Sequence, residues 1–134
     1  MSPAFLRPFL RAAWVPAIIG VIVGSLLPPG SAPLRMLGLL PLNDKAIHAL
    51  AYAILAFLPI IHERREFAIA AALGVMALGI GIEFIQPYWG RNYEVGDMVA
   101  DGLGIFIGAL AAIPLRFTTW MRRLKSQDLS APQL

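Results

Sequence analysis

Four long stretches of apolar residues, separated by short groups of charged or turn-forming residues, make up most of the chain. They cover residues 8–27, 43–61, 67–86 and 97–120. Each is close to the ~17–25 residues that a helix needs to cross a hydrocarbon core ~30 Å thick. A bilayer admits only helices or closed barrels, and the stretches lack the two-residue alternation of barrel strands. The pattern therefore predicts an all-α polytopic membrane protein with four transmembrane helices in one bundle.

The composition favours the same environment. The 134 residues are 58% hydrophobic and only 14% charged, whereas about a quarter of the residues in a soluble domain are charged. A soluble bundle of four wholly buried helices would need more polar surface than this chain has. The chain contains no cysteine, which excludes a disulfide framework, a thiolate metal site and a thiol nucleophile. We therefore expect the lipid bilayer to be the main partner of the protein.

The basic residues indicate an orientation in that bilayer. Eight of the eleven Lys and Arg residues fall on one side of the predicted spans, namely Arg7, Arg11, Arg64, Arg65, Arg116, Arg122, Arg123 and Lys125. The positive-inside rule places this side in the cytoplasm, together with both termini and the turn "HERRE" at 62–66. We accordingly interpret the net charge of +3 as a topology signal and expect no nucleic-acid partner.

The segments outside the second, third and fourth stretches are less informative. Residues 8–27 follow an arginine and precede small residues, as in a signal peptide, but the apolar stretch is long for one and favours a first membrane helix. Prolines at 28, 29, 33 and 41 prevent a continuous helix and predict a loop with a short interfacial turn at 34–40. We expect residues 121–134 to form a flexible cytoplasmic tail of a single domain that spans residues 1–134.

Ionisable and other polar side chains recur near the predicted outer ends of three helices. The second stretch carries Asp44, Lys45, His48 and Tyr52, the third carries Glu83 and Gln86, and the fourth carries Asp97 and Asp101. Residues three and four apart share a helix face, so each set points in one direction. Exposure of such groups to lipid costs about 2.5–3.5 kcal/mol each, so they should face the bundle interior or a water-filled cleft. The spacing predicts an outward-facing polar pocket lined by these three helices and centred on His48, Glu83, Arg91 and Asp97.

Small residues would allow the helices to approach closely around this pocket. The third stretch carries Gly74, Gly79 and Gly81, and the fourth carries a G-x-x-x-G pattern at 104–108. A second interpretation exists for some polar residues: Asp44 and Asp97 are also suited to be N-caps of their helices. Trp89 and Tyr93 are typical of interfacial anchors rather than ligand contacts.

Two segments resemble a known family. The stretches "NDKAIHALAYAILAF" and "GIEFIQPYWGRNYEVGDMVADGLGIFIGAL" are similar to the VanZ-like family of small bacterial integral membrane proteins. The matching positions are Asp44, Lys45, His48, Tyr52, Glu83, Gln86, Arg91, Asp97, Gly104 and Gly108. The chain departs from the family at Asp101, where many relatives carry Asn. The resemblance implies a multi-pass protein of the bacterial inner (cytoplasmic) membrane, and the family's namesake is associated with resistance to the glycopeptide teicoplanin.

These residues suggest a site that binds or modifies an anionic, lipid-linked molecule of the cell envelope. His48, Glu83 and Asp101 form a hypothetical acid/base layer, because burial can separate the pKa values of such groups. The predicted substrate-binding residues are Lys45, Tyr52, Gln86, Arg91, Asp97 and Asp44. A histidine with several carboxylates can bind a divalent cation, but the sequence has no dedicated ligand spacing, so we predict no metal. The cofactor, enzymatic activity and oligomeric state stay open.

Two other classes of function compete with this hypothesis. A small transporter or proton relay could use Glu83, His48 and Asp101, although ionisable residues are scarce in the cytoplasmic halves of the predicted helices. A non-catalytic envelope protein could use the same residues only to fix helix packing. Familiar catalytic motifs are missing, since the chain has neither a G-x-S-x-G elbow nor an H-E-x-x-H pair. The motif "HERRE" is expected to be a solvated run of charges.

Overall fold

The computed structural model describes residues 3–130, with side chains from 8 to 118. Its elements are α1 (Pro3–Leu26), α2 (Ala32–Leu37), α3 (Asp44–His62), α4 (Arg65–Ile85), the 3-10 helix η1 (Gln86–Trp89) and α5 (Val95–Ser130). Four segments are long and apolar enough to cross a membrane: Pro8–Leu26, Asp44–His62, Arg65–Trp89 and Val95–Thr118. No strand occurs between residues 3 and 130. The predicted all-α class with four membrane-spanning helices is therefore confirmed.

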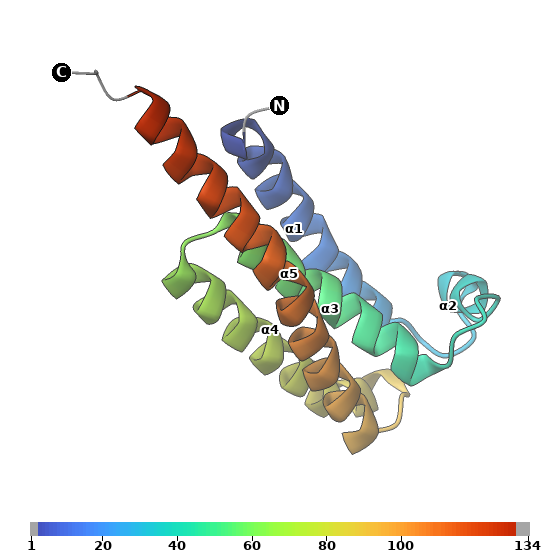
Figure 1. The fold of residues 1–134 in the computed structure, drawn as a ribbon. Helices are drawn as coiled ribbons and strands as arrows, with labels where there is room; N and C mark the ends of the chain where they lie inside the picture. The colour runs from blue at the N-terminus through green and yellow to red at the C-terminus, as the bar shows by residue number, and fades with distance from the viewer. Residues whose placement is uncertain (1–2, 131–134) are drawn as a thin grey trace.

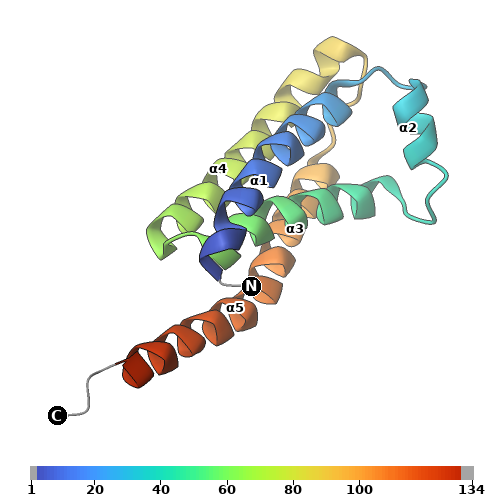
Figure 2. The ribbon, with the colours of Figure 1, turned by 90° about the horizontal axis from the view of Figure 1, so that it is seen from above.

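The four long helices lie alongside one another, and α3 is the central one (Figure 1). It packs against α1, α4 and α5, and its contact with α5 is the most extensive in the molecule. The short helix α2 stands apart from the bundle, near the start of α3 (Figure 2). The start of α1 and the end of α5 lie at the end of the bundle opposite α2 (Figure 1). An even number of spans brings the two ends of the bundle helices to one side, which is the side that the positive-inside rule predicts to be cytoplasmic.

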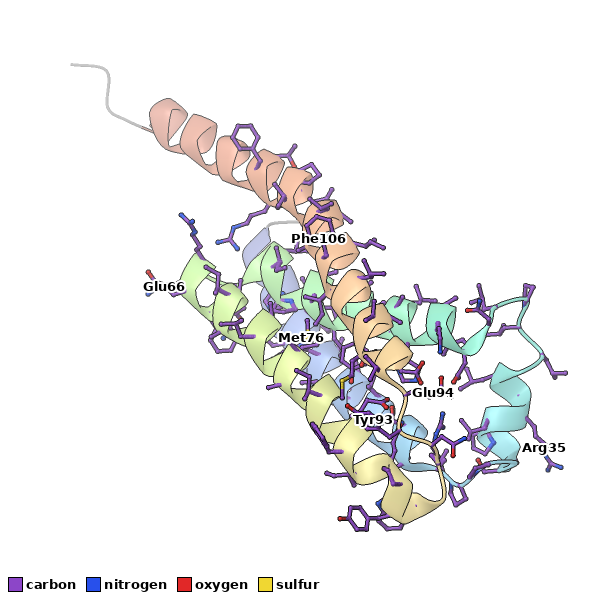
Figure 3. All side chains as sticks on the ribbon, turned by 90° about the horizontal axis from the view of Figure 1, so that it is seen from below. Arg35, Glu66, Met76, Tyr93, Glu94 and Phe106 are labelled. Atoms are coloured by element: carbon purple, nitrogen blue, oxygen red, sulfur yellow. The ribbon has the colours of Figure 1, made fainter. Side chains whose placement is uncertain are left out.

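Polar and apolar residues are distributed as a lipid solvent would require. Many apolar side chains on the outside of the bundle are exposed. The exposed fraction is 67% for Leu73 and 61% for Phe106, which is labelled in Figure 3. The buried polar residues, by contrast, are His48, His62, Glu83, Gln86, Asp97 and Asp101. In water so much exposed apolar surface would favour association. In a bilayer the same surface contacts acyl chains, while the polar groups avoid them.

The close contact of α3 with α5 depends on two glycines. A Cβ atom on Gly104 would lie 2.1 Å from the carbonyl oxygen of Ala49, and one on Gly108 would lie 2.2 Å from that of Ala53. The G-x-x-x-G face thus packs directly on the backbone of α3, as small residues permit in membrane helices. On α4, Gly79 lies close to the side chains of Asp101 and Tyr52, whereas Cβ atoms on Gly74 and Gly81 would meet nothing within 4 Å.

A proline in α3 is compensated by a side chain from α1. Pro59 has no backbone N–H, so the carbonyl of Leu55, four residues earlier, loses its helical donor. The indole nitrogen of Trp14 donates to this oxygen at 2.8 Å. The bond satisfies a carbonyl that would otherwise be unpaired at membrane depth and fixes α1 against α3.

The structure corrects several boundaries expected from the sequence. The N-cap of α3 is Asn43, whose side chain accepts from the amide of Ala46 at 2.8 Å, and Asp44 lies in the first turn. Asp97 also lies inside its helix, with its amide bonded to the carbonyl of Glu94 at 3.0 Å. Where a short interfacial turn was expected at 34–40, the loop contains the short helix α2 from Ala32 to Leu37.

The end of α5 differs most from the expectation. The helix continues to Ser130, where a flexible tail from 121 onward was expected. Residues 121–130 contain no Gly or Pro and include several strong helix formers, so nothing in the sequence ends the helix there. Residues 131–134 lie outside the described part of the chain.

Candidate functional site

His48 lies at the centre of a buried polar cluster between α3 and α5. Its Nδ1 is 3.0 Å from Oδ1 of Asp101, and its Nε2 is 3.7 Å from Oδ2 of Asp97. All three side chains are buried. With Asp101 ionised, its carboxylate accepts from Nδ1–H, which leaves the lone pair of Nε2 on the side of Asp97.

A glycine on α4 makes room for Asp101 and for Tyr52. A Cβ atom on Gly79 would lie 2.7 Å from Oδ2 of Asp101 and 3.1 Å from the Tyr52 hydroxyl. The three helices α3, α4 and α5 therefore meet closely at Gly79. Tyr52 is only 1% exposed and also belongs to the small apolar core.

Lys45 connects the cluster to the loop before α5. Its ammonium nitrogen lies 3.1 Å from Oδ1 of Asp97 and 2.9 Å from Oε2 of Glu94. Gly96 permits this approach, since a Cβ there would lie 2.8 Å from the Lys45 Cε. The amide of Glu94 in turn donates to Oε2 of buried Glu83 at 3.1 Å. Glu94 lies at the end of the molecule opposite Glu66 (Figure 3), so the cluster belongs to the predicted outer end.

A cavity of about 520 Å³ lies on the other side of His48, between α1, α2 and α3. Most of its wall is apolar or backbone, including Gly20 and Gly24 of α1 and Leu37 of α2. Its polar lining residues are Ser25, Asp44, His48, Tyr52 and Arg91. The guanidinium of Arg91 lies 3.8 Å from a carboxylate oxygen of Asp44. The cavity thus has two parts: a groove with apolar walls, and an end lined by polar side chains.

This cavity is not the pocket that the sequence suggested. The predicted pocket was lined by α3, α4 and α5, but the cavity is lined by α1, α2 and α3 with Arg91. Glu83, Asp97 and Asp101 lie buried behind His48 rather than on the cavity wall. The physical reason is the close packing of α3 on α5, where Gly104 and Gly108 lie against the backbone of α3.

Gln86 and Lys45 also have different surroundings from those expected. The Gln86 side chain donates to the backbone carbonyl of Ser25 at 3.2 Å, which satisfies a free carbonyl at the end of α1. It therefore joins η1 to α1 and does not line the cavity. Lys45 is engaged by Glu94 and Asp97 and does not line the cavity either.

Sequence reasoning missed Glu94 and the contribution of α1. Glu94 is not among the predicted site residues, although Lys45 is the one lysine on that side of the predicted spans and forms an ion pair with Glu94. Gly20 and Gly24 are spaced four apart on α1. That spacing could have indicated an open helix face.

A second polar group lies at the opposite end of the bundle, which the sequence predicts to be the cytoplasmic end. Arg11 of α1 forms an ion pair with Glu63, and His62 is 3.3 Å from the same carboxylate. His62 is buried, whereas Arg64, Arg65 and Glu66 are exposed. The expectation that "HERRE" is a solvated charge run therefore holds only for its last three residues. Pairing with Arg11 explains why Glu63 lies against α1.

Asp44, His48 and Asp97 are the described residues that approach a metal-binding arrangement. Each offers one ligand atom, and these atoms all lie within 4.8 Å of one another. Two of the three side chains are buried, and Asp44 is exposed. The contact across two helices could not be predicted from the sequence, in which His48 is the one histidine near the dispersed outer acids.

Comparison with known proteins gives no match. No protein-family model matches the chain, and no similar curated protein or solved structure was found. The resemblance to the VanZ-like family stays a prediction, and the function has to be argued from the site itself.

Proposed function

We propose that this is a VanZ-like protein of the bacterial inner membrane whose cavity binds an anionic, lipid-linked molecule of the cell envelope. The proposal rests on one observation, namely that apolar walls and ionisable side chains line the same cavity. Apolar walls from α1, α2 and α3 lead to a polar end formed by Asp44, His48 and Arg91. An amphipathic ligand fits such a site, with its chain in the groove and its headgroup at the polar end.

The groove wall on α1 is suited to an acyl or prenyl chain. Gly20 and Gly24 are one turn apart, and Cβ atoms on them would meet nothing within 4 Å. The lining residues Leu37 and Ile54 are partly exposed, so the groove is accessible from the surrounding lipid. An apolar chain could therefore enter from the bilayer without crossing water.

Arg91 is the cation best placed to hold a phosphate or carboxylate. A guanidinium binds either group through two parallel hydrogen bonds. Arg91 lines the cavity, and its distance of 3.8 Å from Asp44 is too long for a hydrogen bond. Lys45, the other outer cation of the cluster, is already engaged by two carboxylates. The headgroup is therefore proposed to contact Arg91 first.

The same geometry favours binding over the competing functions. Ser25 lines the cavity, but no hydrogen bond within residues 3–130 joins its hydroxyl to His48, so an activated nucleophile has no support. A proton relay would have to connect the outer cluster with the group at Glu63. Between them lies the apolar core of Tyr52, Leu55 and Val75 with its partners on α1, which offers no polar path within one chain.

Replacement of Arg91 by Gln is expected to weaken binding of an anionic lipid about 10- to 100-fold, because a charged hydrogen bond contributes about 1.5–3 kcal/mol. Fluorescently labelled phosphatidylglycerol, titrated onto detergent-purified protein in EDTA, measures the effect. Arg35→Gln is the matched control, since Arg35 projects from α2 away from the bundle (Figure 3). Equal binding by wild type and both variants, or equal binding of phosphatidylcholine, would contradict the proposal.

The proposed link to glycopeptide resistance needs a cellular test. Expression of the wild type in a susceptible bacterial host should raise teicoplanin tolerance, and Arg91→Gln at equal abundance should not. If wild type that binds the anionic lipid protects nothing, the resistance role is wrong while the binding role stands.

A further inference from the structure

We infer that Asp44, His48 and Asp97 form a binding site for one divalent transition-metal ion at the polar end of the cavity. The inference does not depend on lipid binding. Two ligand atoms of one tetrahedral ion, each bonded at about 2.0–2.2 Å, lie about 3.3–3.6 Å apart. The three ligand atoms lie within 4.8 Å of one another, so ion binding would have to draw them together by up to about 1.5 Å, a shift that rotation of the side chains can supply.

The orientation of His48 points to a ligand on its free nitrogen. The residue is only 8% exposed, and its Nδ1 is paired with Asp101 at 3.0 Å. Its Nε2 has no hydrogen bond to any residue between 3 and 130, and its nearest carboxylate oxygen, Oδ2 of Asp97, is 3.7 Å away. A carboxylate behind a histidine is the usual arrangement that fixes the tautomer and direction of a metal-binding imidazole.

The spacing between Nε2 and Oδ2 of Asp97 suits a bridging ion. At 3.7 Å it is too long for a hydrogen bond but fits two ligands of one cation. Lys45 contacts the other oxygen of Asp97, Oδ1, at 3.1 Å, which leaves Oδ2 available. The exposed Asp44 can rotate toward the same point, because its ion-pair contact among residues 8–118 is the long one with Arg91.

The charge balance also favours a cation. The connected cluster contains five carboxyl groups, from Asp44, Glu83, Glu94, Asp97 and Asp101. The permanent cations in contact with them are Lys45 and Arg91. Bound divalent ions are often the largest local charges in such sites and offset an excess of carboxylates.

The donor set indicates the class of metal. One imidazole nitrogen and two carboxylate oxygens suit Zn²⁺ or Mn²⁺ better than Ca²⁺ or Mg²⁺, which prefer oxygen ligands alone. Three protein ligands leave at least one coordination position open. Asp44 and His48 both line the cavity, so that position would face water or an anionic headgroup.

Isothermal titration calorimetry, with Zn²⁺ titrated into detergent-purified, lipid-free protein, tests the inference. We expect one saturable site per chain, with binding at least 10-fold weaker in Asp44→Asn and lost in His48→Asn. Asp101→Asn, a positioning variant, should weaken binding about 10- to 100-fold. Because Asp44 is exposed, its variant should retain wild-type thermal stability and keep the test independent of folding.

His62→Asn is the control, because it removes the other histidine at the opposite end of the bundle. Its Zn²⁺ affinity should equal that of the wild type. Absence of saturable binding by folded wild type, or equal affinity in folded Asp44→Asn and wild type, would overturn the inference. Lipid binding measured in EDTA is independent of this result, so failure of the metal site and failure of the lipid site are distinguishable.

Discussion

Gly104→Ala is expected to destabilise the protein by about 3 kcal/mol or more, because overpacking of a tight interface costs about 1–3 kcal/mol and this contact has no flexible partner. The added Cβ would lie 2.1 Å from the backbone oxygen of Ala49. Only a movement of α3 away from α5 can relieve that overlap. The movement would also separate His48 from Asp101, so both stability and ligand binding should fall.

Thermal unfolding in detergent, followed by circular dichroism, measures this effect. Gly81→Ala is the matched control, since a Cβ there would meet nothing within 4 Å. Alanine is favoured over glycine within a helix by about 1 kcal/mol, so this variant should be as stable as wild type or slightly more stable. Similar destabilisation in both variants would show that α3 and α5 do not pack through Gly104.

Asp101→Leu should cost about 1–3 kcal/mol, the usual effect of leaving a buried hydrogen-bond donor without its acceptor. Asp101 is 2% exposed and is the hydrogen-bond partner of His48 Nδ1. Leucine would leave that nitrogen buried and unpaired. Asp101→Asn retains an oxygen that can accept from Nδ1, so its loss of stability should be much smaller.

The comparison of these two variants separates packing from hydrogen bonding. Unfolding midpoints and the yield of monodisperse protein in detergent are the measurements. Asp128→Asn, which changes an acid outside the spans, should leave both unchanged. If Asp101→Leu were as stable as wild type, the buried cluster would not contribute to the fold, and the account of α3–α5 packing around His48 would be wrong.

The membrane spans could be predicted because hydropathy is a local property. Each span needs only its own run of apolar residues, and charged residues such as Arg64 and Arg65 separate the runs. The grouping of His48 with Asp101 also followed from local reasoning, since polar side chains at similar depths avoid lipid by turning inward. Their distance of 3.0 Å is consistent with that reasoning.

The location of the cavity could not be predicted, because it depends on how the helices are rotated against one another. Periodicity gave α5 a small-residue face but did not identify the surface that Gly104 contacts, which is the backbone at Ala49. Once α3 and α5 are in close contact, the open space falls on the α1 side of His48. The surroundings of Gln86 depend on helix rotation in the same way: its side chain contacts the backbone carbonyl of Ser25 and does not line the cavity.

Lipid occupancy of the groove tests the central claim most directly. Gly24→Leu places a side chain in the cavity without touching the polar cluster, whereas Gly81→Leu adds the same side chain on α4 outside the cavity. The amount of anionic lipid retained per chain can be measured by native mass spectrometry. The account predicts that Gly24→Leu loses the lipid while Gly81→Leu retains as much as wild type. Equal retention by both folded variants would contradict it.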